Sequence, residues 1–152
     1  MKENQNLFRD LQEDFRKMKK NLLVAQSGGP TAAINATLAG VIKQAIKEEQ
    51  IDQVYGACYG IQGVLEQKFV NLTEKVDTEE KLEKLKRTPA AALGSCRFKL
   101  NDIKEDDSQY QEIVDILHKM NIGYFVYIGG NDSMDTVAKL SAYCKEKGVE
   151  DI

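Results

Sequence analysis

Two segments of the chain share one order of residue types: a short apolar run, a pair of glycines and the start of a helical pattern. The first combines the run 22–25 with the glycines at 28–29, and the second combines the run 124–128 with those at 129–130. Short apolar runs that end at glycine predict buried strands. Parallel strands of a doubly wound sheet end at one edge, where ligands bind. The pair of turns therefore predicts a ligand site at that edge.

Each glycine pair is suited to binding phosphate. Adjacent glycines such as Gly28 and Gly29 let the backbone approach a ligand closely, and the first amides of the following helix have no partners within it. Two common phosphate motifs are absent, because no lysine follows before Lys43 and the spacing does not match a dinucleotide fingerprint. One such turn alone is equally compatible with a tight turn that binds nothing.

The composition is that of an ordinary globular protein. The 152 residues suffice for one domain with a core, and 42% of them are hydrophobic. The net charge of −3 disfavours a nucleic-acid partner, and no apolar run reaches the roughly 20 residues that span a bilayer. The charged N-terminus does not resemble a secretory signal, and Cys58, Cys96 and Cys144 are unclustered. We therefore expect a cytoplasmic protein with no nucleic-acid and no membrane partner.

The whole pattern predicts an α/β fold, with a doubly wound, mostly parallel sheet and helices on both faces. Residues 1–20 are expected to form an amphipathic N-terminal helical extension, and 21–152 the α/β domain. The other expected elements are strands at 53–58 and 69–72, loops at 59–65 and 88–98, and helices at 34–46, 79–87, 108–120 and 133–147.

Two of these helices carry more detailed expectations. The segment that starts at Ser108 matches a capping box, which predicts that Ser108 caps its helix. In the last helix, Met134 and Leu140 are expected on the buried side. The only histidine, His118, has no evident carboxylate or second histidine with which to form a ligand set, so we interpret it as structural.

Spacing alone leaves the roles of two charged residues open. Asp132, in the second glycine turn, is suited to cap the helix that follows, which is worth about 1 kcal/mol. An acid beside a phosphate site points equally to Mg²⁺, which binds one or two carboxylates together with phosphate oxygens. Arg97 lies in a loop of small residues, where a surface ion pair and phosphate binding are both open.

Three segments taken together resemble the 6-phosphofructokinase family. S-G-G at 27–29, followed by Asn35, resembles the first glycine turn of that family. L-G-S-C-R-F at 93–98 resembles its L-G-S-x-R-F loop, and G-G-N-D-S at 129–133 resembles its G-G-D-x-S turn. The resemblance implies a Rossmann-like α/β domain that holds the phosphoryl donor. It also implies fructose 6-phosphate as the acceptor and fructose 1,6-bisphosphate, an intermediate of glycolysis, as the product.

The resemblance also implies roles for individual residues, carried over by position. The implied contacts to the phosphates of the donor are Gly28, Gly29, Arg97, Gly130 and Ser133. Asn131 stands where the family has an acid associated with magnesium. Mg²⁺ is therefore the implied cofactor, and Asn131 its implied contact, through the amide oxygen or a metal-bound water.

The position after Asn131 distinguishes the donors of the family. Users of ATP typically have glycine there and users of pyrophosphate have aspartate, which in this chain is Asp132. Pro30, where users of ATP carry aspartate, points the same way. The resemblance thus implies the pyrophosphate-dependent branch, diphosphate–fructose-6-phosphate 1-phosphotransferase, with Asp132 excluding a nucleotide by charge and bulk.

One part of the family pattern is missing. The T-I-D-N-D-type loop that carries the catalytic base does not occur in the sequence, and neither does the sugar-phosphate domain. We therefore expect an N-terminal fragment of a longer enzyme, inactive alone and homo-oligomeric in its full-length form. The alternatives are an ATP-dependent 6-phosphofructokinase and, if 152 residues is the natural length, a non-catalytic phosphate- or nucleotide-binding module.

Overall fold

A computed structural model describes residues 10, 11, 13, 14, 18–29 and 31–152. Within them a four-stranded sheet has the order β3-β2-β1-β4. The central strands β1, β2 and β4 are parallel, and the short edge strand β3 is antiparallel to β2. The strands span Lys20–Gln26 (β1), Ile51–Ala57 (β2), Phe69–Asn71 (β3) and Ile122–Ile128 (β4).

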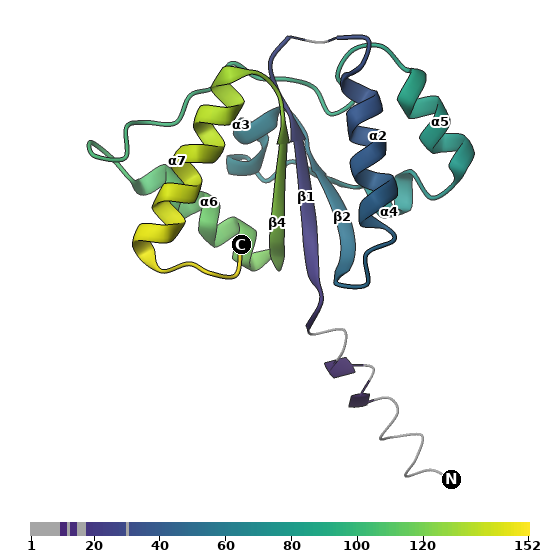
Figure 1. The fold of residues 1–152 in the computed structure, drawn as a ribbon. Helices are drawn as coiled ribbons and strands as arrows, with labels where there is room; N and C mark the ends of the chain where they lie inside the picture. Colours follow the sequence, from purple (N-terminus) through teal and green to yellow (C-terminus); the bar gives the residue numbers. More distant parts are fainter. Residues whose placement is uncertain (1–9, 12, 15–17, 30) are drawn as a thin grey trace.

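Helices cover both faces of the sheet (Figure 1). One face packs against α2, α4 and α5, and the other against α3, α6 and α7. Each layer of helices encloses its own apolar cluster against the sheet, which confirms the predicted α/β fold class. The helices span Ile34–Ala45 (α2), Gly60–Leu65 (α3), Leu72–Lys75 (α4), Glu79–Arg87 (α5), Ser108–Lys119 (α6) and Asn131–Lys147 (α7).

Strand β1 lies at the centre of this arrangement. Its residues Leu23 and Val24 are fully buried, because helices cover both faces and parallel strands flank both edges. Val24 is in register with Gly56 of β2 and Val126 of β4. The three parallel strands therefore end at the same edge, from which both glycine turns emerge (Figure 1).

The predicted loop at 59–65 is wrong, because Gly60–Leu65 is helix α3. Tyr59 and Gly60 have φ angles of 66° and 63°, which reverse the chain directly into the helix. A Cβ atom on Gly63 would lie 1.5 Å from the carbonyl oxygen of Cys58. The glycines therefore permit a close approach of backbone segments here and do not interrupt the helix.

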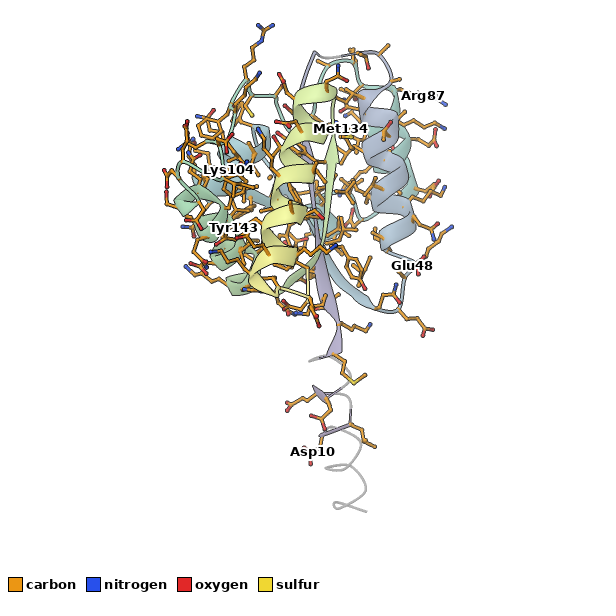
Figure 2. All side chains as sticks on the ribbon, turned by 60° about the vertical axis from the view of Figure 1, so that its left-hand side comes forward. Asp10, Glu48, Arg87, Lys104, Met134 and Tyr143 are labelled. Carbon is orange, nitrogen blue, oxygen red and sulfur yellow. The ribbon has the colours of Figure 1, made fainter. Side chains whose placement is uncertain are left out.

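Two details of the later helices also differ from expectation. Ser108 is the first residue of α6 and not its cap, since Asp107 occupies the N-cap position and makes no side-chain capping bond. On α7 the expected Met134 is 51% exposed, while Leu140 is buried as expected and Tyr143 is buried farther along the helix (Figure 2). The buried side of α7 consists of Ser133, Thr136, Leu140, Tyr143 and Cys144, whose spacing follows the helical repeat.

The predicted extension at 1–20 falls largely outside the described residues. Residues 10, 11, 13, 14 and 18 are helical, and β1 already begins at Lys20. Leu11 and Met18, two apolar residues of this amphipathic segment that the structure describes, are 49% and 76% exposed. No helix in the described part of the chain is both long enough and apolar enough to span a membrane.

Candidate functional site

A cavity of about 850 Å³ lies at the edge where the parallel strands end. Its walls are the first glycine turn, the loop segment 95–99 and the start of α7, with Tyr127 and Thr136 beside them. All seven residues assigned to the site from the sequence line this one cavity, namely Gly28, Gly29, Arg97, Gly130, Asn131, Asp132 and Ser133. Pro30, which together with Asp132 indicated pyrophosphate as the donor, lies outside the described residues.

The two glycine turns are in direct contact. The amide of Ser27 donates to the carbonyl oxygen of Ile128 at 2.8 Å, which joins the ends of β1 and β4. Gly28 has a φ of 81°, and a Cβ atom on it would meet the amide nitrogen of Gly130 at 3.4 Å. Glycine at position 28 is favoured by this left-handed conformation, and its small size keeps the two turns close.

Buried amide side chains hold the loop 88–98 against the first turn. Gln26 accepts a hydrogen bond from the amide of Leu93 at 2.9 Å, and Asn35 accepts one from Ala92 at 2.9 Å. Asn35 also donates to the carbonyl oxygen of Thr88 at 2.8 Å. Both amide side chains are fully buried. Asn35, quoted above as part of the family pattern, therefore acts by positioning the loop.

Two serines tie the loop to the first turn beside the cavity. The hydroxyl of Ser95 donates to the carbonyl oxygen of Gly28 at 2.7 Å, and the hydroxyl of Ser27 donates to that of Cys96 at 3.2 Å. These bonds fix the backbone just before Arg97, whose side chain is exposed at the cavity. No described carboxylate lies within ion-pair distance of Arg97, which leaves its guanidinium available to an anion.

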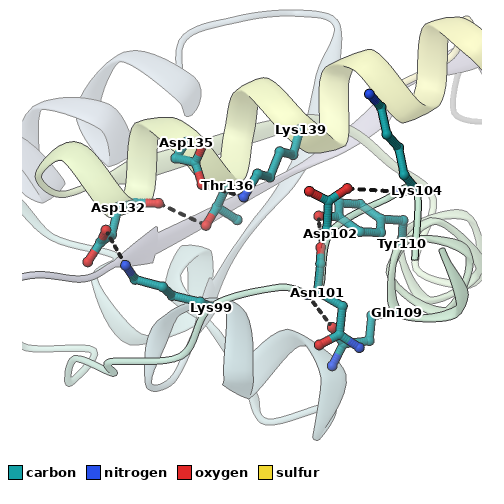
Figure 3. A network of polar contacts seen from close by, with 10 residues as sticks. All are labelled: Lys99, Asn101, Asp102, Lys104, Gln109, Tyr110, Asp132, Asp135, Thr136 and Lys139. Atoms are coloured by element: carbon teal, nitrogen blue, oxygen red, sulfur yellow. Dashed lines mark hydrogen bonds and ion pairs between the residues drawn. The ribbon is translucent and has the colours of Figure 1, made fainter. Parts of the chain in front are cut away.

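The second turn places the start of α7 at the cavity. Gly130 is the N-cap residue and provides no side chain to cap the first amides of this 17-residue helix. Those amides and the helix dipole favour an anion at this point. Asp132 is the second helical residue, so its interpretation as the N-cap is wrong. Its carboxylate instead lies 3.3 Å from Nζ of Lys99 (Figure 3).

Tyr127, near the end of β4, lines the cavity and connects it to α3. Its hydroxyl accepts a hydrogen bond from the amide of Ile61 at 3.1 Å and lies 3.9 Å from Sγ of Cys96. Gly60 leaves room for this contact, since a Cβ atom there would be 2.6 Å from the hydroxyl. Burial raises the pKa of Tyr127 above its ordinary value, so the hydroxyl stays neutral and serves as a connector between three segments.

Residues 21–149 match the phosphofructokinase family. The chain belongs to the phosphofructokinase family. It is 44% identical over 123 residues to the pyrophosphate–fructose 6-phosphate 1-phosphotransferase of Rhodospirillum rubrum, and this match covers 81% of the chain and 29% of the relative. It is 40% identical over 129 residues to the enzyme of the same name from Halomonas elongata, covering 84% of the chain and 30% of the relative.

A solved phosphofructokinase has the same arrangement of elements. The structure of the pyrophosphate-dependent phosphofructokinase from Nitrosospira multiformis superimposes with a TM-score of 0.78 at 37% identity. The similarity covers 88% of this chain and 32% of that protein. The chain thus spans about 30% of the length of the phosphofructokinases it matches.

Two cationic side chains and one carboxylate line the cavity in the described part of the chain. Its charged lining residues in the described chain are Arg97, Lys99 and Asp132. Nowhere among the described residues do three His, Cys, Asp or Glu side chains gather as a metal site. A cation held here by Asn131 or Asp132 would need most of its ligands from the anion itself, which is how Mg²⁺ is usually bound with phosphates.

Three lining residues, Lys99, Tyr127 and Thr136, lie outside the three sequence motifs quoted above. Tyr127 is distinguished in the sequence only by its polar group within a buried strand. Lys99 follows the recognised loop directly, but the direction of its side chain depends on how that loop is anchored. His118, interpreted as structural, lies outside the cavity and contacts Asp151, a carboxylate from the far end of the described chain.

Proposed function

We propose that this chain forms the phosphoryl-donor part of a pyrophosphate-dependent phosphofructokinase. In the complete reaction, pyrophosphate phosphorylates fructose 6-phosphate to give fructose 1,6-bisphosphate. The observation that carries the proposal is the convergence of two glycine turns, the N-terminus of a long helix and a free guanidinium on one cavity. The relatives described above support pyrophosphate as the donor through their names.

The lining residues have separate roles in phosphate binding and in metal binding. The backbone amides of the two turns bind the donor phosphates. The guanidinium of Arg97 binds two oxygens of the same phosphates through parallel hydrogen bonds. The proposed phosphate-binding residues are Gly28, Gly29, Arg97, Gly130 and Ser133. Asn131 holds Mg²⁺ directly or through a water, and the bound cation would neutralise charge on the phosphate oxygens.

Asp132 sets the choice of donor in this proposal. Its carboxylate lines the cavity from the first turn of α7, where the chain of a nucleoside triphosphate would bring additional charge and bulk. A negative charge beside that position disfavours a longer phosphate donor more than it disfavours pyrophosphate. The alternative, an ATP-dependent phosphofructokinase, requires that Asp132 leave room for the nucleotide.

The 152-residue chain is proposed to bind the donor without transferring it. Asp132 is the one carboxylate lining the cavity among the described residues, and it is paired with Lys99. Phosphoryl transfer needs a base at the acceptor hydroxyl in addition to a charge clamp on the donor. We therefore expect no turnover of fructose 6-phosphate by this chain, as also expected of a non-catalytic binding module.

Titration calorimetry on the 152-residue chain tests the proposal. We expect saturable binding of pyrophosphate in the presence of Mg²⁺, and binding of ATP with Mg²⁺ that is weaker by at least about tenfold. Arg97→Gln should weaken pyrophosphate binding, whereas Arg87→Gln, an exposed change away from the cavity, should not. Tighter binding of ATP would favour the ATP-dependent alternative. Binding of neither donor would contradict a donor site.

A further inference from the structure

Lys99 lies on the cavity wall that faces α7, and the roles assigned above do not include it. Its Nζ is 3.3 Å from Oδ1 of Asp132 (Figure 3). The side chains of Lys99 and Asp132 are 72% and 75% exposed, so the pair contributes little to the stability of the fold. The main effect of this contact is on the net charge of the cavity lining.

The backbone around Lys99 is anchored on both sides. Two residues later, the carbonyl oxygen of Asn101 accepts a hydrogen bond from the hydroxyl of the buried Tyr110 at 2.7 Å. Three residues earlier, the carbonyl oxygen of Cys96 accepts a bond from Ser27 at 3.2 Å. The segment between these anchors is short, and within it Nζ of Lys99 reaches the carboxylate of Asp132 at the start of α7.

The position of Asp132 creates an electrostatic conflict that Lys99 resolves. The carboxylate lies in the first turn of α7, beside the amides that favour an anion. Unpaired, it would repel a phosphate and cancel the charge of Arg97, leaving the described lining neutral. With Lys99 included, two cations face one carboxylate and the lining has a net charge of +1.

We propose that Lys99 compensates the charge of Asp132 and thereby allows the cavity to bind a phosphate donor. The cavity then accepts pyrophosphate while Asp132 stays in place to exclude a nucleotide. Lys99 acts through Asp132 and is therefore a positioning residue. This inference rests on the proposed function of the cavity, because it concerns how that cavity tolerates an acid.

A double-mutant cycle tests the inference by calorimetry with two probes, pyrophosphate with Mg²⁺ and inorganic phosphate. Lys99→Gln should raise the Kd for both probes about tenfold at low ionic strength, and Lys99→Arg should retain most of the affinity. Adding Asp132→Asn to Lys99→Gln should restore the Kd to within about threefold of the wild type, because no uncompensated charge remains. Lys104→Gln is the matched control, an exposed lysine of the same loop that does not line the cavity.

The two probes separate failure of the inference from failure of the proposed function. Equal affinities for the Lys99→Gln and Lys104→Gln variants would overturn the inference. So would a double variant as weak as Lys99→Gln, since Lys99 would then act on the anion and not through Asp132. A wild-type chain that binds phosphate but not pyrophosphate would remove the proposed donor and leave the comparison of variants intact. Binding of neither probe would overturn both.

Discussion

Gly129 stands at the tightest point of the second glycine turn. A Cβ atom there would lie 2.0 Å from Oγ and 2.7 Å from Cβ of Ser133, which is buried at the start of α7. We expect Gly129→Ala to lower the free energy of unfolding by about 1–3 kcal/mol, because the helix start must shift. Urea denaturation measures this change.

Gly29→Ala is the matched control for Gly129→Ala. The same substitution at Gly29 meets nothing within 4 Å, and its φ is not in the left-handed region. Its effect on the free energy of unfolding should be within about 0.5 kcal/mol. Equal losses for the two variants would show that the second turn relaxes freely.

Asp132 offers a test of donor choice at a single side chain. Asp132→Gly removes both charge and bulk, and should improve the Kd of ATP relative to that of pyrophosphate by about tenfold or more. Asp132→Asn removes the charge and keeps the bulk, so it should recover only part of this change. Calorimetry with both donors gives the ratio. A ratio unchanged in both variants would leave Asp132 without a part in donor selection.

Six of the seven residues named from the sequence were brought together because they lie in the glycine turns after β1 and β4, and Arg97 joins them because Ser27 and Ser95 tie its loop to the first turn. Their roles remain predictions, whereas their common location is a property of the fold. Lys99 could not be placed from the sequence, because its position depends on the packing of its loop, which is bonded to Ser27 of the first turn and to Tyr110 of α6. Asp132 lies in the first turn of α7 and not at its N-cap, and its ion pair with Lys99 was equally invisible to local patterns.

At the scale of elements, β1 and β4 were predictable because their apolar runs are short, β-prone and followed by a glycine pair. Helix α3 was not, since the glycines that permit its close packing are the residues that usually indicate a loop. The four-residue α4 was also missed, because a single turn is too short for a hydrophobic repeat. The buried face of α7 followed the helical spacing and not the distribution of apolar residues.

Replacing two helical glycines by alanine should change the free energy of unfolding in opposite directions. In α3, a Cβ atom on Gly63 would lie 1.5 Å from the carbonyl oxygen of Cys58, so Gly63→Ala should cost about 2 kcal/mol or more. In α2, the exposed Gly40 has nothing within 4 Å, so Gly40→Ala should stabilise by about 0.5–1 kcal/mol. Chemical denaturation of the pair measures both effects. Stabilisation by Gly63→Ala would contradict the packing of α3 described here.

At the scale of the whole molecule, Asp151 connects distant parts of the chain. Its carboxylate is 2.9 Å from Nε2 of His118 at the end of α6 and 3.0 Å from Nζ of Lys20 at the start of β1. Hydrogen bonding to His118, and then to Lys20, lowers the pKa of Asp151 from 3.8 to about 2. A lowered pKa in the folded state means that this contribution is present above pH 3.8 and is lost as the pH falls through 2.

Asp151→Asn should therefore reduce stability in a manner that depends on pH. The loss at neutral pH should be at most about 1 kcal/mol, because the Asp151 side chain is 49% exposed and its ion pair with Lys20 is screened by solvent. The difference between wild type and variant should shrink as the pH approaches 2. Denaturation across this range measures it, and a difference that is constant with pH would contradict the contacts of Asp151.

A phosphoryl donor is proposed to bind where the two glycine turns meet. Titrating pyrophosphate with Mg²⁺ into isotope-labelled chain and following backbone amides by NMR tests it most directly. We predict saturable shifts at Gly28, Gly29 and Gly130, with amides of the distant helix α5 unchanged. Saturable shifts confined to residues outside this cavity, with those three glycine amides unaffected, would contradict the account.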